Sequence, residues 1–444
     1  MWIGIDDTDS PDGGCTTWVL TEVLAVARDH GLDLLGAPRL VRLNPNIPFK
    51  TRGNAALSAR FGRGAGRTRT VGSIGGRPVV AFSGGRALSS GAEVRFREAA
   101  WTRVLARAPV REGTDPAIVA SRRRLPARVY WDAVREVVPV ESTVRTLEGA
   151  GAWYRHRGDP QGLVGAAAAV AWTGRRGTWE LVAYRDPARW GTRRAVDAVS
   201  VRAAARSHPE LFLCDDPRTR RLLVAPHTAC PILFGIRGTD AATLLDVRTE
   251  IRSEPVERWV LFRTNQATGD HLRRRTVEEL TPYTSGEVAA TVREFSQVLP
   301  GGHARVTVGD DHGAEIEVLA FEPTKTLPRV VRALAPGDRV LLRGSRGKDC
   351  ILRLESLRIV RWAPRFGPSR APECPACGRR ARSLGRGRGY RCPECHRRWP
   401  PESATRTTDS PPFPPAEEHP TPSARRHLHP LVRERPDSAR RESF

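Results

Sequence analysis

The stretch MWIGIDDTDSPDGGCTTWVL, residues 1–20, joins a short apolar run to three aspartates and then to a second apolar run. The first run predicts a strand, and Asp6, Asp7 and Asp9 follow it directly. Clustered carboxylates cannot be buried without a cation, so they need a divalent metal or nearby arginines. Because Mg²⁺ prefers hard oxygen ligands and phosphate, this cluster indicates a site for magnesium and a nucleotide phosphate.

Thr16 and Thr17 follow a Gly-Gly turn and open a segment with helical spacing that ends at Gly31. A helix N-terminus presents backbone N–H groups to phosphate. Carboxylates, metal, phosphate and a hydroxyl would thus meet in one place, as phosphoryl transfer requires. Two alternatives stay open. One is an Asp-rich turn that caps the helix. The other is the nucleophile loop of haloacid dehalogenase-type phosphatases, which needs a later lysine, and Lys50 is the only lysine in this part of the chain.

The chain of 444 residues carries a formal net charge of +23 and has a pI of about 11.0. Its length predicts roughly three domains, and its charge predicts a polyanionic partner such as nucleic acid. A solvated basic surface without a specific partner is the alternative. We expect no membrane span and no signal peptide. Scattered thiols and paired Cys-x-x-Cys motifs favour a reducing, cytoplasmic compartment.

Two further stretches contain candidate phosphate-binding or metal-binding residues. In LNPNIPFKTRGNAAL, Lys50 and Arg52 flank a threonine next to a flexible Gly-Asn pair, which suits phosphate. In EGTDPAIV, Asp115 stands in a turn that presents another carboxylate. A third stretch, TNQATGDHL (residues 264–272), is a dense polar cluster. Ordinary basic or polar loops remain the alternative for all three.

Four cysteines have the spacing C-x₂-C-x₁₄-C-x₂-C: Cys374, Cys377, Cys392 and Cys395. Each pair fits a knuckle turn, and four thiolates close a tetrahedral shell. The spacing therefore predicts a structural zinc ion, with His396 as a less favoured substitute ligand.

Patterning divides the rest of the chain. Residues 1–125 indicate an α/β unit, and residues 128–262 indicate an α+β sandwich in which GLVGAAAAVAW (residues 162–172) is expected to be a strand or part of a strand pair. Five short strands and one helical piece between residues 285 and 362 predict an OB-fold barrel, a fold that often binds nucleic acid. From residue 401 onward, low apolar content predicts disorder.

Taken in order, GIDDTDS, CTT, NPNIPFKTRGN, EGTDP, YRDPARWGTRR, TNQATGDHL and CPACG resemble one family over roughly residues 1–400. That family is the archaeal isoleucine-tRNA 2-agmatinylcytidine synthetases, also called TiaS or agmatidine synthases. Ala117 departs from the glycine that the family usually has after the T-D-P turn. The resemblance implies an α/β and α+β multidomain protein with a kinase-like domain (1–127), a ferredoxin-like domain (128–265), an OB-fold (266–365), a zinc ribbon (371–400) and a disordered tail (401–444).

The resemblance also implies an activity: ATP-dependent conjugation of agmatine to the 2-carbon of the wobble cytidine in the isoleucine tRNA with a CAU anticodon. It implies ATP, Mg²⁺ and structural Zn²⁺ as cofactors, tRNA and agmatine as substrates, and no obligate protein partner. Thr16 would accept phosphate, the three aspartates would bind metal and ATP phosphates, and Arg185 and Arg193 would face ATP or RNA. The alternative is a noncatalytic OB-fold and zinc-ribbon protein that binds RNA or single-stranded DNA.

Overall fold

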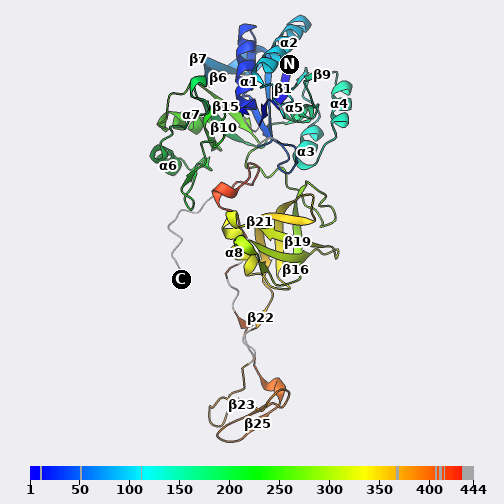
Figure 1. Ribbon diagram of the computed structural model, residues 1–444, viewed down its shortest axis with the longest axis vertical. Helices are drawn as coiled ribbons and strands as arrows, with labels where there is room; N and C mark the ends of the chain where they lie inside the picture. Colours follow the sequence, from blue (N-terminus) through cyan, green and yellow to red (C-terminus); the bar gives the residue numbers. More distant parts are fainter. Residues whose placement is uncertain are drawn as a thin grey trace.

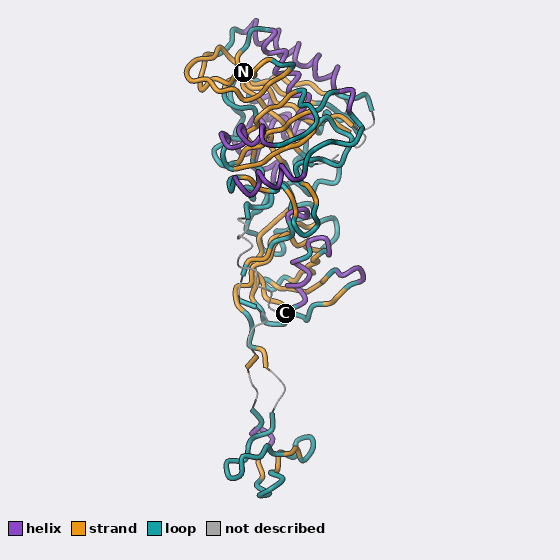
Figure 2. The backbone as a smooth tube through the Cα atoms, turned by 90° about the vertical axis from the view of Figure 1, so that its left-hand side faces the viewer, coloured by secondary structure: helices purple, strands orange, loops and turns teal. Residues whose placement is uncertain are grey.

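The computed structural model consists of a large sheet unit, a barrel and a small ribbon, which follow one another along the long axis of the molecule (Figure 1). Figure 2 shows the same order after a quarter turn, with the ribbon farthest from the sheet unit. The structure describes residues 1–10, 13–50, 53–111, 113–366, 370–405, 408–409, 413–414 and 416–432. Within these ranges, no helix has the length and apolar character needed to cross a membrane.

An 11-stranded sheet forms the centre of the first unit, and its main path runs β11-β14-β10-β15-β5-β6-β1-β8-β9. β4 and β7 pair beside β6. The strands are β1 (Trp2–Asp6), β4 (Asp33–Leu35), β5 (Arg39–Arg42), β6 (Ala55–Ile74), β7 (Arg77–Arg86), β8 (Ala117–Ser121), β9 (Trp153–His156), β10 (Thr178–Tyr184), β11 (Leu211–Phe212), β14 (Ile232–Gly238) and β15 (Arg258–Thr264).

In the described part of this unit, seven helices pack around the sheet: α1 (Thr16–Asp29), α2 (Ser90–Arg107), α3 (Ala127–Arg135), α4 (Val140–Gly149), α5 (Gly162–Ala171), α6 (Ala198–Ser207) and α7 (Ala241–Glu250). The predicted first strand and the helix that follows it are confirmed as β1 and α1. A short hairpin of β2 (Asp9–Ser10) and β3 (Gly13–Gly14) lies between them. β9 pairs with β8, so the strand that follows residue 127 extends the N-terminal part of the sheet.

The stretch GLVGAAAAVAW forms helix α5, so its expected strand is wrong. Every residue of this helix is buried. The sequence therefore lacks the 3.6-residue alternation of apolar and polar residues by which a surface helix is recognised. Alanine is the strongest helix former, and this property decides the structure here. The helix lies directly on β1: a Cβ added to Gly4 would be 2.2 Å from the carbonyl oxygen of Ala166.

β15 joins the two halves of the sheet. It pairs antiparallel with β10 on one side, parallel with β5 on the other, and also contacts β6. The predicted first and second domains therefore share one hydrogen-bonded sheet and one continuous hydrophobic core. The division between them at residue 127 stays a prediction.

The barrel confirms the predicted OB-fold pattern of five strands and one helix. Pairing runs β16-β20-β21-β19-β18, and a β16–β18 pairing closes the barrel. In sequence, α8 lies between the third and fourth of these strands, β19 and β20. The elements are β16 (Ser285–Val292), β17 (Gln297–Val298), β18 (Ala304–Gly309), β19 (Glu315–Ala320), α8 (Thr326–Arg332), β20 (Arg339–Arg346) and β21 (Ile351–Arg361).

Beyond the barrel, β23 (Arg382–Ser383), β24 (Tyr390–Arg391) and β25 (Arg398–Trp399) form the three-stranded ribbon. The chain then returns, and residues 416–432 pack at the junction of the barrel and the sheet unit (Figure 1). Strand β27 (Glu417–Glu418) pairs antiparallel with β21. The expectation of a disordered tail therefore does not describe residues 416–432, because pairing and burial against the folded units compensate for their low apolar content.

Candidate active site

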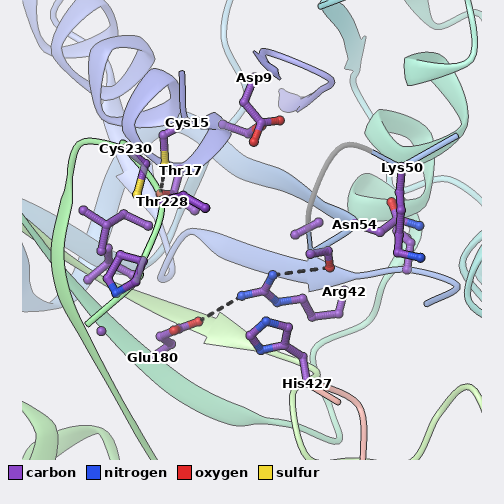
Figure 3. A pocket seen from close by; sticks show the side chains of 18 of the residues that line it. Asp9, Cys15, Thr17, Arg42, Lys50, Asn54, Glu180, Thr228, Cys230 and His427 are labelled. Atoms are coloured by element: carbon purple, nitrogen blue, oxygen red, sulfur yellow. Dashed lines mark hydrogen bonds and ion pairs between the residues drawn. The ribbon is translucent and has the colours of Figure 1, made fainter. Parts of the chain in front are cut away.

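A cavity of about 480 Å³ opens at the carboxyl end of β1. Its walls come from the acidic cluster, the N-terminus of α1, the Lys50 loop, strands β10 and β14, the loop at residues 221–230 and the returning C-terminal segment. Figure 3 shows side chains from these separate elements turned toward one space. Of the sequence-predicted residues, the cavity brings together Asp6, Asp7, Asp9, Thr16 and Lys50.

The three aspartates lie close to one another at the end of β1. The backbone N–H of Asp7 donates to Oδ1 of Asp6 at 2.8 Å. Burial, together with the charges of Asp7 and Asp9, raises the pKa of Asp6 well above its usual range. Burial, and then Asp115, Asp9 and Asp159, raise the pKa of Asp7 to about 7. This cluster therefore favours a cation, because a cation lowers the cost of ionising it.

Helix α1 points its N-terminus at the same cavity. Cys15 occupies the N-cap without a side-chain capping hydrogen bond, and the first turn contains no acidic residue. Thr16 and Thr17 are both buried and both line the cavity. Thr17 Oγ1 lies 3.0 Å from Cys15 Sγ, so its hydroxyl has a local partner. The partial positive charge of a helix N-terminus suits an anionic ligand here.

The other predicted residues of this region differ in whether they line the cavity. Lys50 lines it from an exposed loop, with Nζ 3.4 Å from the carbonyl oxygen of Ile47. Asp115 is half-buried beside the cluster and contributes to the raised pKa of Asp7, but it does not line the cavity. The prediction for Arg52 lies outside the described residues.

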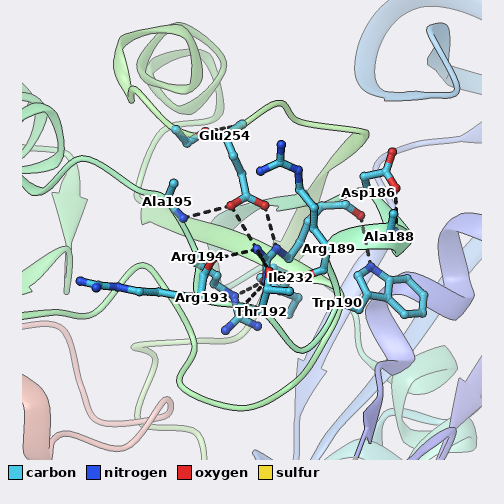
Figure 4. A network of polar contacts seen from close by, with 12 residues as sticks. Asp186, Ala188, Arg189, Trp190, Thr192, Arg193, Arg194, Ala195, Ile232 and Glu254 are labelled. Carbon is cyan, nitrogen blue, oxygen red and sulfur yellow. Dashed lines mark hydrogen bonds and ion pairs between the residues drawn. The ribbon is translucent and has the colours of Figure 1, made fainter.

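Arg185 does not line the cavity, and its placement opposes the predicted phosphate contact. Its side chain is 1% exposed and forms a buried ion pair with Glu254, with Nε 2.8 Å from Oε1. Its remaining donors bind Thr192 and the carbonyl oxygen of Arg193. Figure 4 labels Glu254, Thr192 and Arg193, three partners in this network. A buried guanidinium in which each of the three nitrogens donates to protein stabilises the loop rather than phosphate. Arg193 itself is exposed and away from the cavity.

Sequence reasoning missed the arginines that face the acidic cluster. Arg42, Arg221 and Arg237 line the cavity, and Glu180 lies between two of them, 3.8 Å from Arg42 and 3.0 Å from Arg237. Each of these residues lies on a different strand of a chain rich in arginine, so no local sequence signal separates them from surface charge. The cavity thus has an acidic wall and a basic wall.

Arg194, which follows the predicted Arg193, was not predicted from sequence either. It holds the cavity loop by donating to the carbonyl oxygens of Pro226, Thr228, Cys230 and Ile232, at 2.7–2.9 Å. The YRDPARWGTRR stretch therefore supports the cavity wall from behind.

The TNQATGDHL stretch forms a joint between the units. Asn265 Oδ1 accepts from the backbone N–H of Arg42 at 2.7 Å, and Asn265 Nδ2 donates to Tyr130 Oη. His271 lies 2.9 Å from Glu355 of the barrel. Gln266 connects to Glu180 in the cavity wall. The stretch is therefore not an ordinary polar loop, because its polar side chains are buried and hydrogen-bonded.

The described residues contain one group of three or more His, Cys, Asp or Glu residues whose potential metal-ligand atoms all lie within 4.8 Å of one another. It consists of Cys374, Cys377, Cys392 and Cys395. The Sγ atoms of Cys374 and Cys395 are 3.3 Å apart, and those of Cys377 and Cys392 are 3.4 Å apart. Four sulfurs this close fit a tetrahedral zinc ion. The oxygens of the three aspartates do not gather as tightly.

The fold and the cavity define a class: a multidomain α/β protein with a phosphate-type site, an OB barrel and a zinc ribbon. The chain matches family models for the TiaS TCKD domain over residues 2–157, the TiaS FLD domain over residues 160–271 and the TiaS C-terminal zinc ribbon domain over residues 371–406. The chain belongs to the TiaS family.

Relatives match along the whole chain. The isoleucine-tRNA 2-agmatinylcytidine synthetase TiaS of Methanosarcina mazei is 35% identical, over 98% of this chain and 97% of the relative. The protein of the same name from Archaeoglobus fulgidus is 34% identical, over 98% and 97%.

Solved structures match as well. The complex of TiaS with its isoleucine tRNA and ATP has a TM-score of 0.81 at 31% identity and covers 98% of each chain. The complex of TiaS with the same tRNA, AMPCPP and agmatine has a TM-score of 0.78 at 29% identity, and the alignment covers 97% of this chain and 96% of that one.

Proposed function

We propose that this chain is an ATP-dependent ligase that conjugates agmatine to the wobble cytidine of the isoleucine tRNA with a CAU anticodon. The observation that carries the proposal is the cavity in which the acidic cluster, the N-terminus of α1 and Lys50 meet a wall of arginines. A noncatalytic nucleic-acid binder has no need of half-buried carboxylates there, because they repel a polyanion. Membership of the TiaS family supports the same activity.

The reaction transfers a phosphoryl group and then replaces it. The 2-carbonyl oxygen of cytidine forms a bond to a phosphorus atom of ATP, the phosphoanhydride P–O bond at that phosphorus breaks, and the rest of ATP leaves with the bridging oxygen. The cytidine oxygen, a poor leaving group, is thereby converted into a phosphate ester. The primary amine of agmatine then forms a bond to C2. The bond between C2 and the oxygen breaks, phosphate leaves with that oxygen, and the amine nitrogen loses a proton. The wobble base has to leave its stacked position to enter such a cavity.

In this proposal, each element of the site has one role. The N-terminus of α1 and Lys50 bind phosphate. In a transfer separate from that to cytidine, the Thr16 hydroxyl oxygen forms a bond to a phosphorus atom of the nucleotide, the phosphoanhydride P–O bond at that phosphorus breaks, and the hydroxyl loses its proton. Asp6, Asp7 and Asp9 hold Mg²⁺, with Asp115 as a further acidic neighbour. Mg²⁺ commonly takes only one or two carboxylates and completes its shell with water and substrate phosphate, which suits a loosely gathered cluster. When bound, the ion supplies charge neutralisation for the phosphates.

The other units grip the RNA. The OB barrel and the zinc ribbon bind the tRNA body, and zinc bound by the four cysteines fixes the ribbon's fold. A tRNA substrate also assigns the protein to the cytoplasm.

The test compares Thr16→Val with Thr16→Ser. Valine keeps the shape of threonine and removes the hydroxyl, whereas serine keeps the hydroxyl. We expect Thr16→Val to lose agmatine conjugation, measured by mass spectrometry of tRNA nucleosides, while the Kd for tRNA stays near the wild-type value. Thr16→Ser should retain measurable conjugation. Wild-type turnover in Thr16→Val would remove this hydroxyl from the mechanism.

A further inference from the structure

The C-terminal segment 416–432 forms part of the cavity wall, although it follows the zinc ribbon in sequence. Its start pairs with β21 of the barrel. Its end is held by the loop at residues 267–269: the N–H of Ala267 donates to the carbonyl oxygen of His427 at 2.8 Å, and the N–H of Gly269 donates to that of Leu428 at 2.9 Å. Leu428 is 1% exposed. The segment is therefore an ordered strap across the junction of the units.

An ion pair fixes the strap beside the cavity. Arg426 lies 3.1 Å from Oε1 of the buried Glu355 in β21, and it also donates to Asn46 in the NPN loop. His271 contacts the other oxygen of Glu355 at 2.9 Å. Arg426 thus ties the barrel and the sheet unit to the strap, and it sets the position of the next residue, His427.

Hydrogen bonding decides the tautomer of His427. Gln266 Nε2 donates to the carboxylate of Glu180, which can only accept, so Gln266 Oε1 faces the other way. His427 Nδ1 lies 3.0 Å from that Oε1. Because an amide oxygen only accepts, Nδ1 carries the proton. In the neutral ring Nε2 then has a lone pair and no proton.

This Nε2 lies at the cavity. His427 is one of the lining residues, and a Cβ added to Gly53, across the cavity wall, would be 3.5 Å from Nε2. Figure 3 shows the ring beside Arg42, in front of the wall that contains Glu180. Burial, and then the charges of Arg42 and Arg237, lower the pKa of His427 well below its usual range, so the ring stays neutral at working pH.

We propose that His427 is a substrate-binding residue whose Nε2 accepts a hydrogen bond from an N–H or O–H group of a small substrate. This inference deepens the proposed function and rests on it. Two small substrates of that reaction carry such a hydrogen-bond donor: agmatine, through its amine or guanidinium, and ATP, through its hydroxyl or amino groups. A phosphate oxygen is excluded as the partner, because it offers no proton to this nitrogen.

The test is His427→Asn with His429→Asn as its matched control. Asparagine keeps an N–H at the position of Nδ1, which preserves the bond to Gln266, and it removes Nε2. His429 lies on the same strap, 3.2 Å from His419, and does not line the cavity. For both variants, one would measure the apparent KM for agmatine, the apparent KM for ATP and the thermal midpoint of unfolding.

We expect His427→Asn to raise one of these two KM values by about tenfold, the effect of one lost hydrogen bond, and to leave the other near wild type. The value that rises identifies the substrate. His429→Asn should change neither KM. Unchanged KM values in His427→Asn, or an equal change in both variants, would overturn the proposal. A wild-type protein that makes no conjugate would instead contradict the proposed function itself.

Discussion

Asp7 has a backbone φ of +55°, which is uncommon for any residue but glycine. Such a conformation costs of order 1–3 kcal/mol, and the surrounding packing has to maintain it. Helix α5 supplies that packing. A Cβ added to its Gly162 would lie 3.1 Å from the Cβ of Asp7, and one added to its Gly165 would lie 1.8 Å from Oδ2 of Asp6. The two glycines leave the space that the Asp7 Cβ and the Asp6 carboxylate fill.

Gly165→Ala tests whether this space matters. The added methyl group overlaps Asp6, so we expect the carboxylates to shift and conjugation to fall by at least about tenfold, with a smaller effect on folding because alanine favours a helix. Steady-state kinetics and circular dichroism would measure the two effects. Gly149→Ala at the end of α4 is the control, since its Cβ would meet nothing within 4 Å. Equal activity in both variants would contradict the packing argument.

At the scale of elements, the strap depends on Glu355. Burial raises the pKa of this residue, but Arg426 and His271 outweigh burial and lower the value to about 2. The folded pKa is thus below the usual value of 4.5. The stability from this carboxylate is therefore fully present above pH 4.5 and is lost as the pH falls toward 2.

We expect Glu355→Gln to lower the free energy of unfolding at pH 7 by on the order of 2 kcal/mol, because the half-buried Arg426 loses its ion pair and His271 loses a charged hydrogen-bond partner. The difference from wild type should shrink below pH 4.5. Denaturant unfolding at several pH values would measure it, with the exposed Glu278→Gln as the control. A difference that stays constant down to pH 3 would contradict the ion-pair account.

Zinc binding by the four cysteines of the ribbon is a second prediction at the scale of elements. Cys392→Ser removes one of four thiolates, so we expect the zinc content, measured by plasma mass spectrometry, to fall and tRNA binding to weaken. ATP binding should persist, because the cavity shares no residue with the ribbon. Full zinc content in the variant would show that the ligand set is wrong, and loss of ATP binding would show that the two units depend on each other.

Some elements could be predicted from sequence because their signals are local. The spacing of the four cysteines, the aspartates after β1 and the alternating strands of the barrel need no distant partner to be recognised. Helix α5 could not be predicted, because complete burial hides its period. Arg185 could not be told from a ligand-binding arginine, since its partner Glu254 is 69 residues away. The strap has the composition of a disordered tail, and only the folded units order it.

At the scale of the whole molecule, the sheet unit, the barrel and the ribbon form an extended row, and the strap lies at the junction of the sheet unit and the barrel (Figure 1). The net charge of +23 accompanies this extended shape, which suits a long polyanion. In the proposed function, one unit performs chemistry at the wobble base, and the others hold the rest of the tRNA. Agmatine conjugation to that tRNA is the activity that this arrangement supports.

The most direct test is mass spectrometry of nucleosides from an isoleucine tRNA transcript with a CAU anticodon. The transcript would be incubated with the full chain, Mg²⁺ and ATP, with and without agmatine. We predict a cytidine heavier by agmatine minus water, formed only when both ATP and agmatine are present. Tight binding of the transcript with no modified cytidine would contradict the ligase activity and favour a noncatalytic RNA-binding protein.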